Sequence, residues 1–285
     1  MNTDEHGLNL ADGSSFSRRS FLAFPALGAV AMAKGRIPVG LQLYSIREDC
    51  KRDLPGTLAA VAKMGYEGVE FAGYYDRGAK DLRTMLDDLK LKPFSTHVNI
   101  KTLLGDDLEK TVEFNQILGN SRITVASMPA AKTIQTWYDY AKQFNTIAER
   151  LQRYHMRVGF HNHARELDLL DGKRPWDVFG ENTSAEVTMQ MDLAHFPEHK
   201  LDPVDYMKRF AGRVRMMHLK DYPPDERFVL LGDGVIEWKK VFAAAESVGG
   251  IECYIVEQER YPPPLTPIEC VDRCLRNFRR LHGNQ

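Results

Sequence analysis

The sequence predicts an α/β protein folded as a single-domain (β/α)8 TIM barrel, and three observations support this. Short apolar runs typical of strands alternate with longer stretches in which apolar residues recur at helical spacing. Eight such pairs fit into roughly 250 residues, the usual length of this barrel. Ionisable residues follow directly after several of the strand-like runs. The composition, 43% hydrophobic and 27% charged, is that of an ordinary globular protein.

The first half of the barrel begins with VGLQLYS at 39–45, an apolar run expected to form a strand. A helix is expected over 53–64, where four apolar residues share one face and Gly65 ends the pattern. GVEFA at 68–72 is the second strand, and a helix follows at 79–90.

The next two units repeat this order. PFSTHV at 93–98 precedes a helix at 107–118. RITVAS at 122–127 precedes a long helix at 133–154, whose apolar residues lie on one face.

The second half supplies four more strands and four helices by the same criteria. The strands are expected at 157–163, 188–196, 213–221 and 253–259, and the helices near 174–180, 203–210, 237–248 and 265–281. A doubly wound open sheet is the alternative, but no Gly-rich phosphate loop follows an early strand. No linker divides the chain, so one barrel domain is expected over 37–281.

The N-terminal segment predicts export. Ser17-Arg18-Arg19-Ser20-Phe21-Leu22 is a twin-arginine pattern, and the apolar run at 21–33 ends in Ala-Met-Ala, a small-x-small cleavage pattern. We therefore expect a twin-arginine export signal over 1–33, a periplasmic location and the Tat machinery as a partner. The alternatives are an uncleaved anchor or a chance pair of arginines in a tail.

Charge and cysteine content exclude several classes of function. The net charge is −1 with both signs interspersed, which lacks the basic footprint of a nucleic-acid binder. The four cysteines form no C-x-x-C pair, so the chain has neither a zinc ribbon nor a thioredoxin motif.

A metal site is predicted from the ionisable residues at the strand ends. Burying such groups is costly unless they bind something, and in a parallel barrel the strand ends meet at one mouth. Asp192, His218 and Glu257 are the main candidate ligands, and His161 is a fourth. A mixed nitrogen and oxygen set suits one divalent ion, with Mn²⁺ or Co²⁺ favoured and Zn²⁺ or Fe²⁺ possible. The alternative is a group of hydrogen-bonded structural residues.

Further roles follow from position. His163 lies two residues after His161 and therefore faces the same side of the strand, where it is expected to act as acid–base or to hold a substrate oxygen. Lys220 is expected to stabilise an enolate oxygen; its alternative is an ion pair with Asp221 or a nearby acid.

Four more residues are expected to bind substrate or to support the ligands. His195, three residues after Asp192, lies where the strand gives way to a loop and is expected to touch the ligand. Glu70 and His97 are expected to line the opposite wall of the mouth. Glu166 is expected to orient a histidine, because metal-bound imidazoles usually donate their second N–H to an acceptor.

In these motifs the chain resembles the sugar phosphate isomerase/epimerase superfamily, the xylose isomerase-like TIM barrels. The likeness covers about residues 37–281 and rests on GLQLYSIRE, KMGYEGVEF, GFHNHARE, MDLAHF, MHLKD, LGDGVIEW and YIVEQE in the expected order. It implies a metal held by strands five to eight, at His161, Asp192, His218 and Glu257. The family's usual Glu on strand five is His161 here. The H-x-H, H-x-K-D and GDGVI segments are similar to inosose dehydratase.

The resemblance implies proton removal next to a carbonyl. Because export argues against a phosphosugar and the sequence shows no phosphate cradle, the expected substrate is a free sugar, a keto-sugar or a glycoside. Isomerase or epimerase activity is placed first because it prevails in the family, with Glu257, His163, His161 and Lys220 as catalytic residues. The alternative is a dehydratase or lyase, toward which His161 points, because only Glu257 remains of the paired carboxylate bases. A sugar-binding barrel without activity is third. An endonuclease would need more metal ligands and a basic face. A homo-oligomer is possible.

Overall fold

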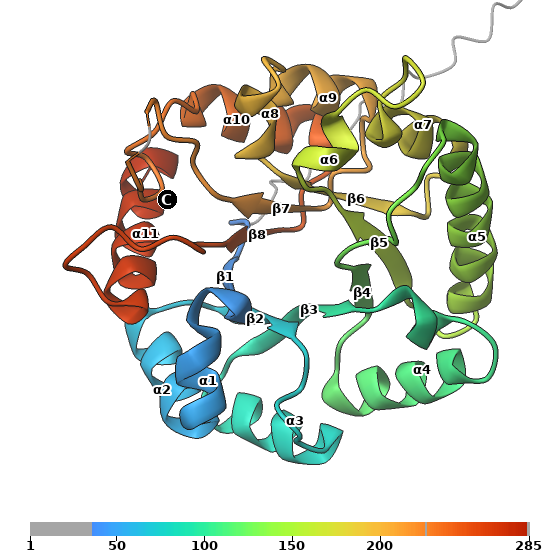
Figure 1. Cartoon of the computed structure of the whole chain (residues 1–285). Coiled ribbons are helices and arrows are strands. Elements are labelled where there is room, and N and C mark those ends of the chain that lie inside the picture. The colour runs from blue at the N-terminus through green and yellow to red at the C-terminus, as the bar shows by residue number, and fades with distance from the viewer. Residues whose placement is uncertain (1–35, 226, 284–285) are drawn as a thin grey trace, which may run out of the picture. The chain divides into compact units, whose positions relative to one another are not determined.

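The computed structural model describes residues 36–225 and 227–283, which lie in one compact unit. Eight parallel strands pair in chain order and close into a barrel (Figure 1). The strands are β1 (Val39–Gln42), β2 (Gly68–Ala72), β3 (Lys92–Val98), β4 (Arg122–Val125), β5 (Arg157–His161), β6 (Thr188–Asp192), β7 (Met216–Leu219) and β8 (Cys253–Val256). The predicted (β/α)8 fold is therefore confirmed. The predicted export signal at 1–33 lies outside the described residues.

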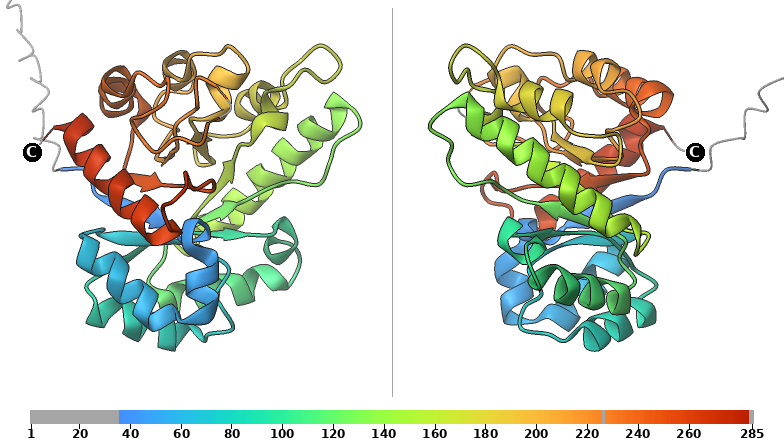
Figure 2. Two further views of the ribbon diagram at one scale, coloured as in Figure 1. Left: turned by 60° about the vertical axis from the view of Figure 1, so that its left-hand side comes forward. Right: turned by 90° about the vertical axis from the view of Figure 1, so that its right-hand side faces the viewer.

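The longer helices lie around the outside of the barrel (Figure 2). They are α2 (Leu54–Met64), α3 (Ala79–Asp88), α4 (Asp107–Leu118), α5 (Ile134–Gln152), α7 (Pro175–Asn182), α9 (Pro203–Arg209), α10 (Trp238–Ala244) and α11 (Pro267–His282). Short helical segments are η1 (Leu43–Ile46), α1 (Arg47–Arg52), η2 (Ile100–Leu103), α6 (Ala164–Leu167), α8 (His195–Glu198) and η3 (Ala245–Gly249). None of the described helices has the length and apolar character that a membrane span requires.

Six strands, β1 and β4 to β8, are shorter than predicted. In two of them a polar side chain at the strand end bonds the backbone beyond it. The Gln42 side chain accepts from the Tyr44 N–H at 3.0 Å, and the chain turns into η1. Asp192 Oδ1 accepts from the Ala194 N–H at 3.0 Å, and α8 follows. Strand β7 starts at Met216 rather than 213 and ends at Leu219.

The barrel interior is layered. Its lower layer is apolar and consists of Phe94, Met216, Cys253 and Ile255. A Cβ atom at Gly40 or Gly68 would lie 2.6 or 2.7 Å from the Phe94 ring, so these glycines make room for it. Buried polar side chains, among them Gln42, Glu70 and Gln190, lie nearer the carboxyl ends of the strands. The interior is thus filled, and chemistry is confined to the mouth above.

The amino-terminal side of the barrel carries a charge cluster around Glu252. Its carboxylate binds Arg122 at 2.8 Å, Arg157 at 2.9 Å and Arg215 at 3.0 Å. Burial acts to raise the pKa of Glu252, but the three arginines outweigh it and lower the pKa below its ordinary value of 4.5. The cluster therefore favours the folded state while this carboxylate is ionised.

We expect Glu252→Gln to lower the free energy of unfolding by about 2 kcal/mol at neutral pH, because the arginines lose their shared counter-charge. The folded pKa of Glu252 is lowered, so its contribution is complete above pH 4.5 and is lost as the pH falls below that value. Urea unfolding of both proteins at neutral and acid pH measures this. Glu48→Gln, an exposed matched control paired with Lys51, should change little. If the wild type and Glu252→Gln differed as much in their free energies of unfolding at acid pH as at neutral pH, the ionised Glu252 carboxylate would not be the source of the stability.

Candidate metal centre

Four ligand-type side chains meet at the carboxyl ends of neighbouring strands. His161 and Asp192 end β5 and β6, His218 lies in β7, and Glu257 follows β8. Each offers one ligand atom, and these four atoms lie within 4.8 Å of one another. All four side chains are buried. The structure therefore brings together the four residues predicted as ligands.

His218 is held between two carboxylates. Its Nε2 lies 2.5 Å from Glu70 Oε2, and its Nδ1 lies 3.1 Å from Glu257 Oε2. Burial acts to lower the pKa of His218, but Glu257 and Glu70 outweigh it and raise the pKa to about 10. Because Glu70 holds Nε2, Nδ1 is the nitrogen that faces the other candidate ligands, as in carboxylate–histidine–metal triads.

His161, which belongs to the same cluster, has a buried nitrogen, Nδ1, without a hydrogen-bond partner among the described residues. Burial lowers the pKa of His161 well below its usual value, so the ring is neutral and its free lone pair can bind a cation. A buried polar atom without a partner is unusual, and a metal ion would satisfy it. The donor set of two imidazoles and two carboxylates therefore fits a divalent transition metal.

The structure corrects the place predicted for Glu70. The side chain does not line the wall of the mouth; it is completely buried below it. Its carboxylate accepts from Gln42 Nε2 at 2.8 Å and from Gln190 Nε2 at 2.7 Å, in addition to His218. Burial acts to raise the pKa of Glu70, but His97 and His218 outweigh it and lower the pKa to about 2. Glu70 therefore supports His218 and is out of reach of a substrate in the mouth.

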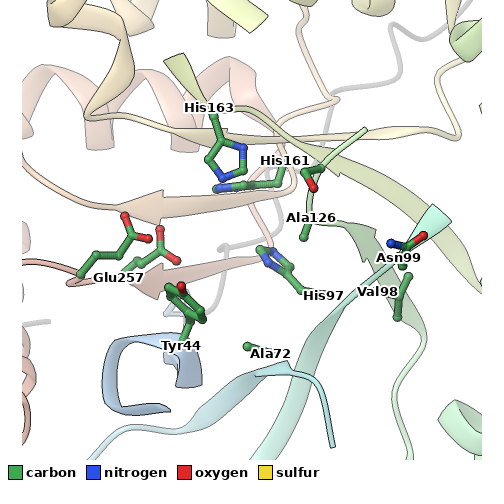
Figure 3. Close-up of a pocket in the computed structure, with 11 residues that line it drawn as sticks. Tyr44, Ala72, His97, Val98, Asn99, Ala126, His161, His163 and Glu257 are labelled. Atoms are coloured by element: carbon green, nitrogen blue, oxygen red, sulfur yellow. The ribbon is translucent and has the colours of Figure 1, made fainter. Parts of the chain in front are cut away.

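His97 does lie on the wall of the mouth, as predicted. It lines the cavity beside His161, and its Nε2 lies 2.8 Å from Gln190 Oε1 and 3.3 Å from Glu70 Oε2 (Figure 3). Its expected contact with substrate stays a prediction.

Lys220 contacts three carboxylates. Its Nζ lies 3.3 Å from Asp192 Oδ2 and 3.7 Å from Glu257 Oε2, and it binds Glu259. The alternative role, an ion pair with a nearby acid, is therefore confirmed for these three carboxylates. It is wrong only for Asp221, whose carboxylate accepts backbone N–H groups of the loop after β7. Sequence reasoning missed Glu259. The available signal was its position two residues after Glu257, which puts both on the same side of the chain.

His163 and His195 flank the ligand cluster. His163 and His161 line one cavity with ring centroids 4.7 Å apart, so the predicted common side is confirmed (Figure 3). Burial lowers the pKa of His163. His195 Nε2 lies 3.4 Å from Asp192 Oδ2; burial acts to lower the pKa of His195, but this carboxylate outweighs it and raises the pKa.

Glu166 has a different role from the one predicted. It is completely buried and accepts from the backbone N–H of His163 at 2.9 Å and from Arg165 Nε at 2.8 Å. It therefore fixes the start of α6 rather than a histidine ring, and it does not reach the cavity. Asn162 is structural, as expected: its Oδ1 accepts from the Asp192 N–H at 3.0 Å.

The cavity beside the cluster has a volume of about 370 Å³ and a lining of mixed polar and apolar character. Its lining is Tyr44, Ala72, His97, Val98, Asn99, Ala126, Ser127, His161, His163, Glu257 and Glu259 (Figure 3). Among the described residues, no lysine or arginine lines it. A space of this size holds a small polar molecule.

We expect Glu70→Gln to weaken metal binding by about 10- to 100-fold, the usual effect of removing the acceptor that orients a ligating histidine. Calorimetric titration with Co²⁺ measures this, with circular dichroism as a check that the protein is folded. Glu48→Gln serves as the matched control, because that carboxylate is exposed and pairs only with surface cations. Unchanged affinity in a folded Glu70→Gln protein would show that Glu70 does not support the centre.

Known proteins share this arrangement of strands. The chain is 25% identical over 212 residues to 3-dehydroshikimate dehydratase of Pseudomonas aeruginosa. This alignment covers 70% of the chain but only 32% of that protein. The chain thus spans about a third of this relative. It is 21% identical over 259 residues to inosose dehydratase of Clostridium tetani, covering 74% of the chain and 84% of that protein.

Solved structures agree in fold. A sugar phosphate isomerase/epimerase from Parabacteroides distasonis is 26% identical with a TM-score of 0.72, covering 88% of the chain and 96% of that structure. The zinc-bound IolI protein is 14% identical with a TM-score of 0.64, covering 86% of the chain and 98% of that structure. The family model described as xylose isomerase-like TIM barrel matches residues 58–277. The chain therefore belongs to the xylose isomerase-like TIM barrel family.

Proposed function

We propose that this protein is a divalent-metal-dependent lyase that removes a proton next to the carbonyl of an uncharged keto-sugar or keto-cyclitol and expels a β-substituent. The observation that carries this proposal is the chemistry of the ligand cluster. At the end of β5 the cluster has the neutral imidazole of His161 rather than a carboxylate. Of the two carboxylates in the cluster, Asp192 and Glu257, only Glu257 also lines the cavity. The dehydratases among the relatives support elimination over the isomerisation that the sequence alone placed first.

The metal would be held by His161, Asp192, His218 and Glu257. When bound, a divalent cation acts as a Lewis acid that withdraws electrons from a carbonyl oxygen and so acidifies the neighbouring C–H bond. The zinc of the structurally similar IolI protein supports a metal of this kind.

Glu257 is the proposed base. It faces the cavity, and although burial acts to raise its pKa, His218 and Lys220 outweigh this and lower it, so the group is a carboxylate at neutral pH. The electrons of the broken C–H bond form a C=C bond as the C–O bond to the β-substituent breaks. The departing oxygen needs a proton.

His195 is better suited than His163 to supply that proton. The pKa of His195 is raised by Asp192, whereas burial lowers that of His163. His163 instead suits a contact to a substrate hydroxyl, one of the two roles expected for it. Lys220 retains its charge, because its contacts to Asp192, Glu257 and Glu259 outweigh burial and raise its pKa.

An uncharged substrate is supported by the lining of the cavity. Two carboxylates line it and, within the described part of the chain, no lysine or arginine does, while Lys220, which contacts both of these carboxylates, is already bound to three carboxylates. A phosphate or carboxylate group would therefore find no free counter-charge among these residues. The predicted export signal supports the same choice, since phosphosugars are chiefly cytoplasmic, and on it we base a periplasmic site of action.

Isomerase or epimerase activity is the second candidate. It is favoured by the similarity to the Parabacteroides protein and by the presence of both Glu257 and His163 on one cavity, as two bases would require.

Mass spectrometry after incubation with a panel of keto-sugars in D₂O separates the candidates. Elimination from a free keto-sugar gives a product lighter than the substrate by one water, whereas isomerisation or epimerisation conserves the composition and introduces deuterium. If neither occurs with metal bound, the proposed lyase is wrong and a sugar-binding barrel without activity is favoured.

A further inference from the structure

A second cavity opens at the same mouth. It has a volume of about 330 Å³ and is formed by the loops that follow β6, β7 and β8. Glu259 lines both cavities. His195 and Lys220 line the second one, and both contact Asp192 of the ligand cluster. The candidate centre is therefore flanked by two spaces, each of the size that holds a small ring.

Each cavity has one exposed aromatic side chain. Tyr44 lines the first and is 43% exposed; Phe228 lines the second and is 46% exposed. They are the only two aromatic residues among the exposed large hydrophobic residues of the described part of the chain. An arginine lies over each ring, Arg47 4.4 Å from the Tyr44 centroid and Arg260 5.8 Å from the Phe228 centroid. The ring surface that stays exposed can pack against the C–H face of a sugar or another ring, so its position beside a polar site points to a ligand.

Buried side chains fix the loop after β7, which forms one wall of the second cavity. Gln258 donates from Nε2 to the Val229 carbonyl at 3.0 Å, next to Phe228. Asp221 accepts from Gly232 N–H at 2.8 Å and from Trp238 Nε1 at 2.8 Å, which fixes the far end of the same loop. The loop is thus held directly after Phe228, at Val229, and is closed further along the chain by the bonds from Gly232 and Trp238 to Asp221.

We propose that the mouth is a two-subsite cleft for a glycoside: the keto-sugar ring binds in the Tyr44 cavity, and the ring attached through its glycosidic oxygen binds against Phe228. This deepens the proposed function and rests on it. The two cavities share Glu259, which binds Lys220, so the glycosidic oxygen would lie near these two residues.

The elimination then cleaves the glycoside. Glu257 takes the proton from the carbon between the carbonyl and the anomeric carbon, and a C=C bond forms as the anomeric C–O bond breaks. The departing oxygen gains a proton in exchange for the one that Glu257 removes, and it leaves as an alcohol with the second ring. No oxidation or reduction occurs and no water is consumed, because the keto-sugar leaves as an enone.

Phe228→Ala tests the second subsite by binding alone. The metal-loaded protein is titrated calorimetrically with matched pairs of a free sugar and its phenyl β-glycoside in the gluco, galacto, manno and xylo series, and with the corresponding disaccharides. We expect at least one glycoside to bind about fivefold to tenfold more tightly than its free sugar, the range expected for one aromatic contact. Phe228→Ala should remove this gain and leave the free-sugar affinity unchanged. The matched control is Leu169→Ala, which removes an exposed side chain that lines neither cavity.

Equal affinities within every pair, or no binding by any pair, would overturn the proposal. So would a Phe228→Ala protein that keeps the preference for glycosides. A gain with phenyl glycosides but not with disaccharides would identify the second ring as an aromatic aglycone, and the reverse would identify it as a sugar. Elimination from a free keto-sugar without any glycoside preference would leave the proposed lyase intact and reject only the second subsite.

Discussion

Glu257→Gln is expected to lower the rate of proton abstraction by about 10²- to 10⁴-fold, the contribution of a general base. The amide keeps the shape of the side chain and one oxygen toward His218, but it cannot accept the substrate proton. Deuterium exchange into the keto-sugar measures the rate. Because Glu257 is also a candidate ligand, the exchange rate is divided by the amount of bound metal. The remaining decrease then reports the loss of the base alone.

The matched control is Glu259→Gln. Glu259 lines the same cavity but is not among the four clustered ligands, and it binds Lys220 rather than His218. We expect this variant to bind metal as the wild type does and to lose much less activity. Equal rates for wild type and Glu257→Gln at equal metal content would show that Glu257 is not the base.

Asp192→Asn should have the second large effect, on metal binding. Asp192 is completely buried and lies in contact with Lys220 and His195, so its charge is the main anionic charge on the β6 side of the cluster. Loss of an orienting residue already weakens metal binding about 10- to 100-fold, and we expect loss of this ligand charge to exceed that. Metal content after dialysis, measured by mass spectrometry, reports the effect.

His161→Ala, tested in parallel, decides whether the unpaired Nδ1 is a ligand. Asp168→Asn is the matched control, because its side chain is 67% exposed and pairs with His199 outside the cluster. Full metal occupancy in both Asp192→Asn and His161→Ala would reject the assigned site.

Much of the barrel could be predicted from the sequence, because strand and helix periods differ and the alternation is regular. The ligand set could also be predicted, since Asp192 and Glu257 each follow an apolar run that has to end at the barrel mouth. Strand ends were less accurate. Whether Gln42 continues the strand or bonds the Tyr44 N–H depends on local backbone geometry rather than on hydrophobicity.

Depth within the barrel could not be predicted. Glu70 and His97 both lie on strand-like runs, yet one is buried below the centre and the other lines the cavity. The difference depends on the register of the strands, which shifts between Val69 and Glu70 where β2 pairs with β3. The ion-pair partners of Lys220 could not be predicted either, because they depend on which loops lie next to it in the folded barrel. Such contacts are set by tertiary packing across the closed barrel.

Metal removal and restoration tests the central claim most directly. The protein is stripped with a chelator, assayed for deuterium exchange or elimination with the keto-sugar panel in D₂O, and assayed again after addition of Mn²⁺, Co²⁺ or Zn²⁺. We expect activity to disappear with the metal and to return with one equivalent of a divalent ion, in wild type but not in Asp192→Asn. Activity that is unaffected by complete metal removal would contradict a metal-dependent proton abstraction at this centre.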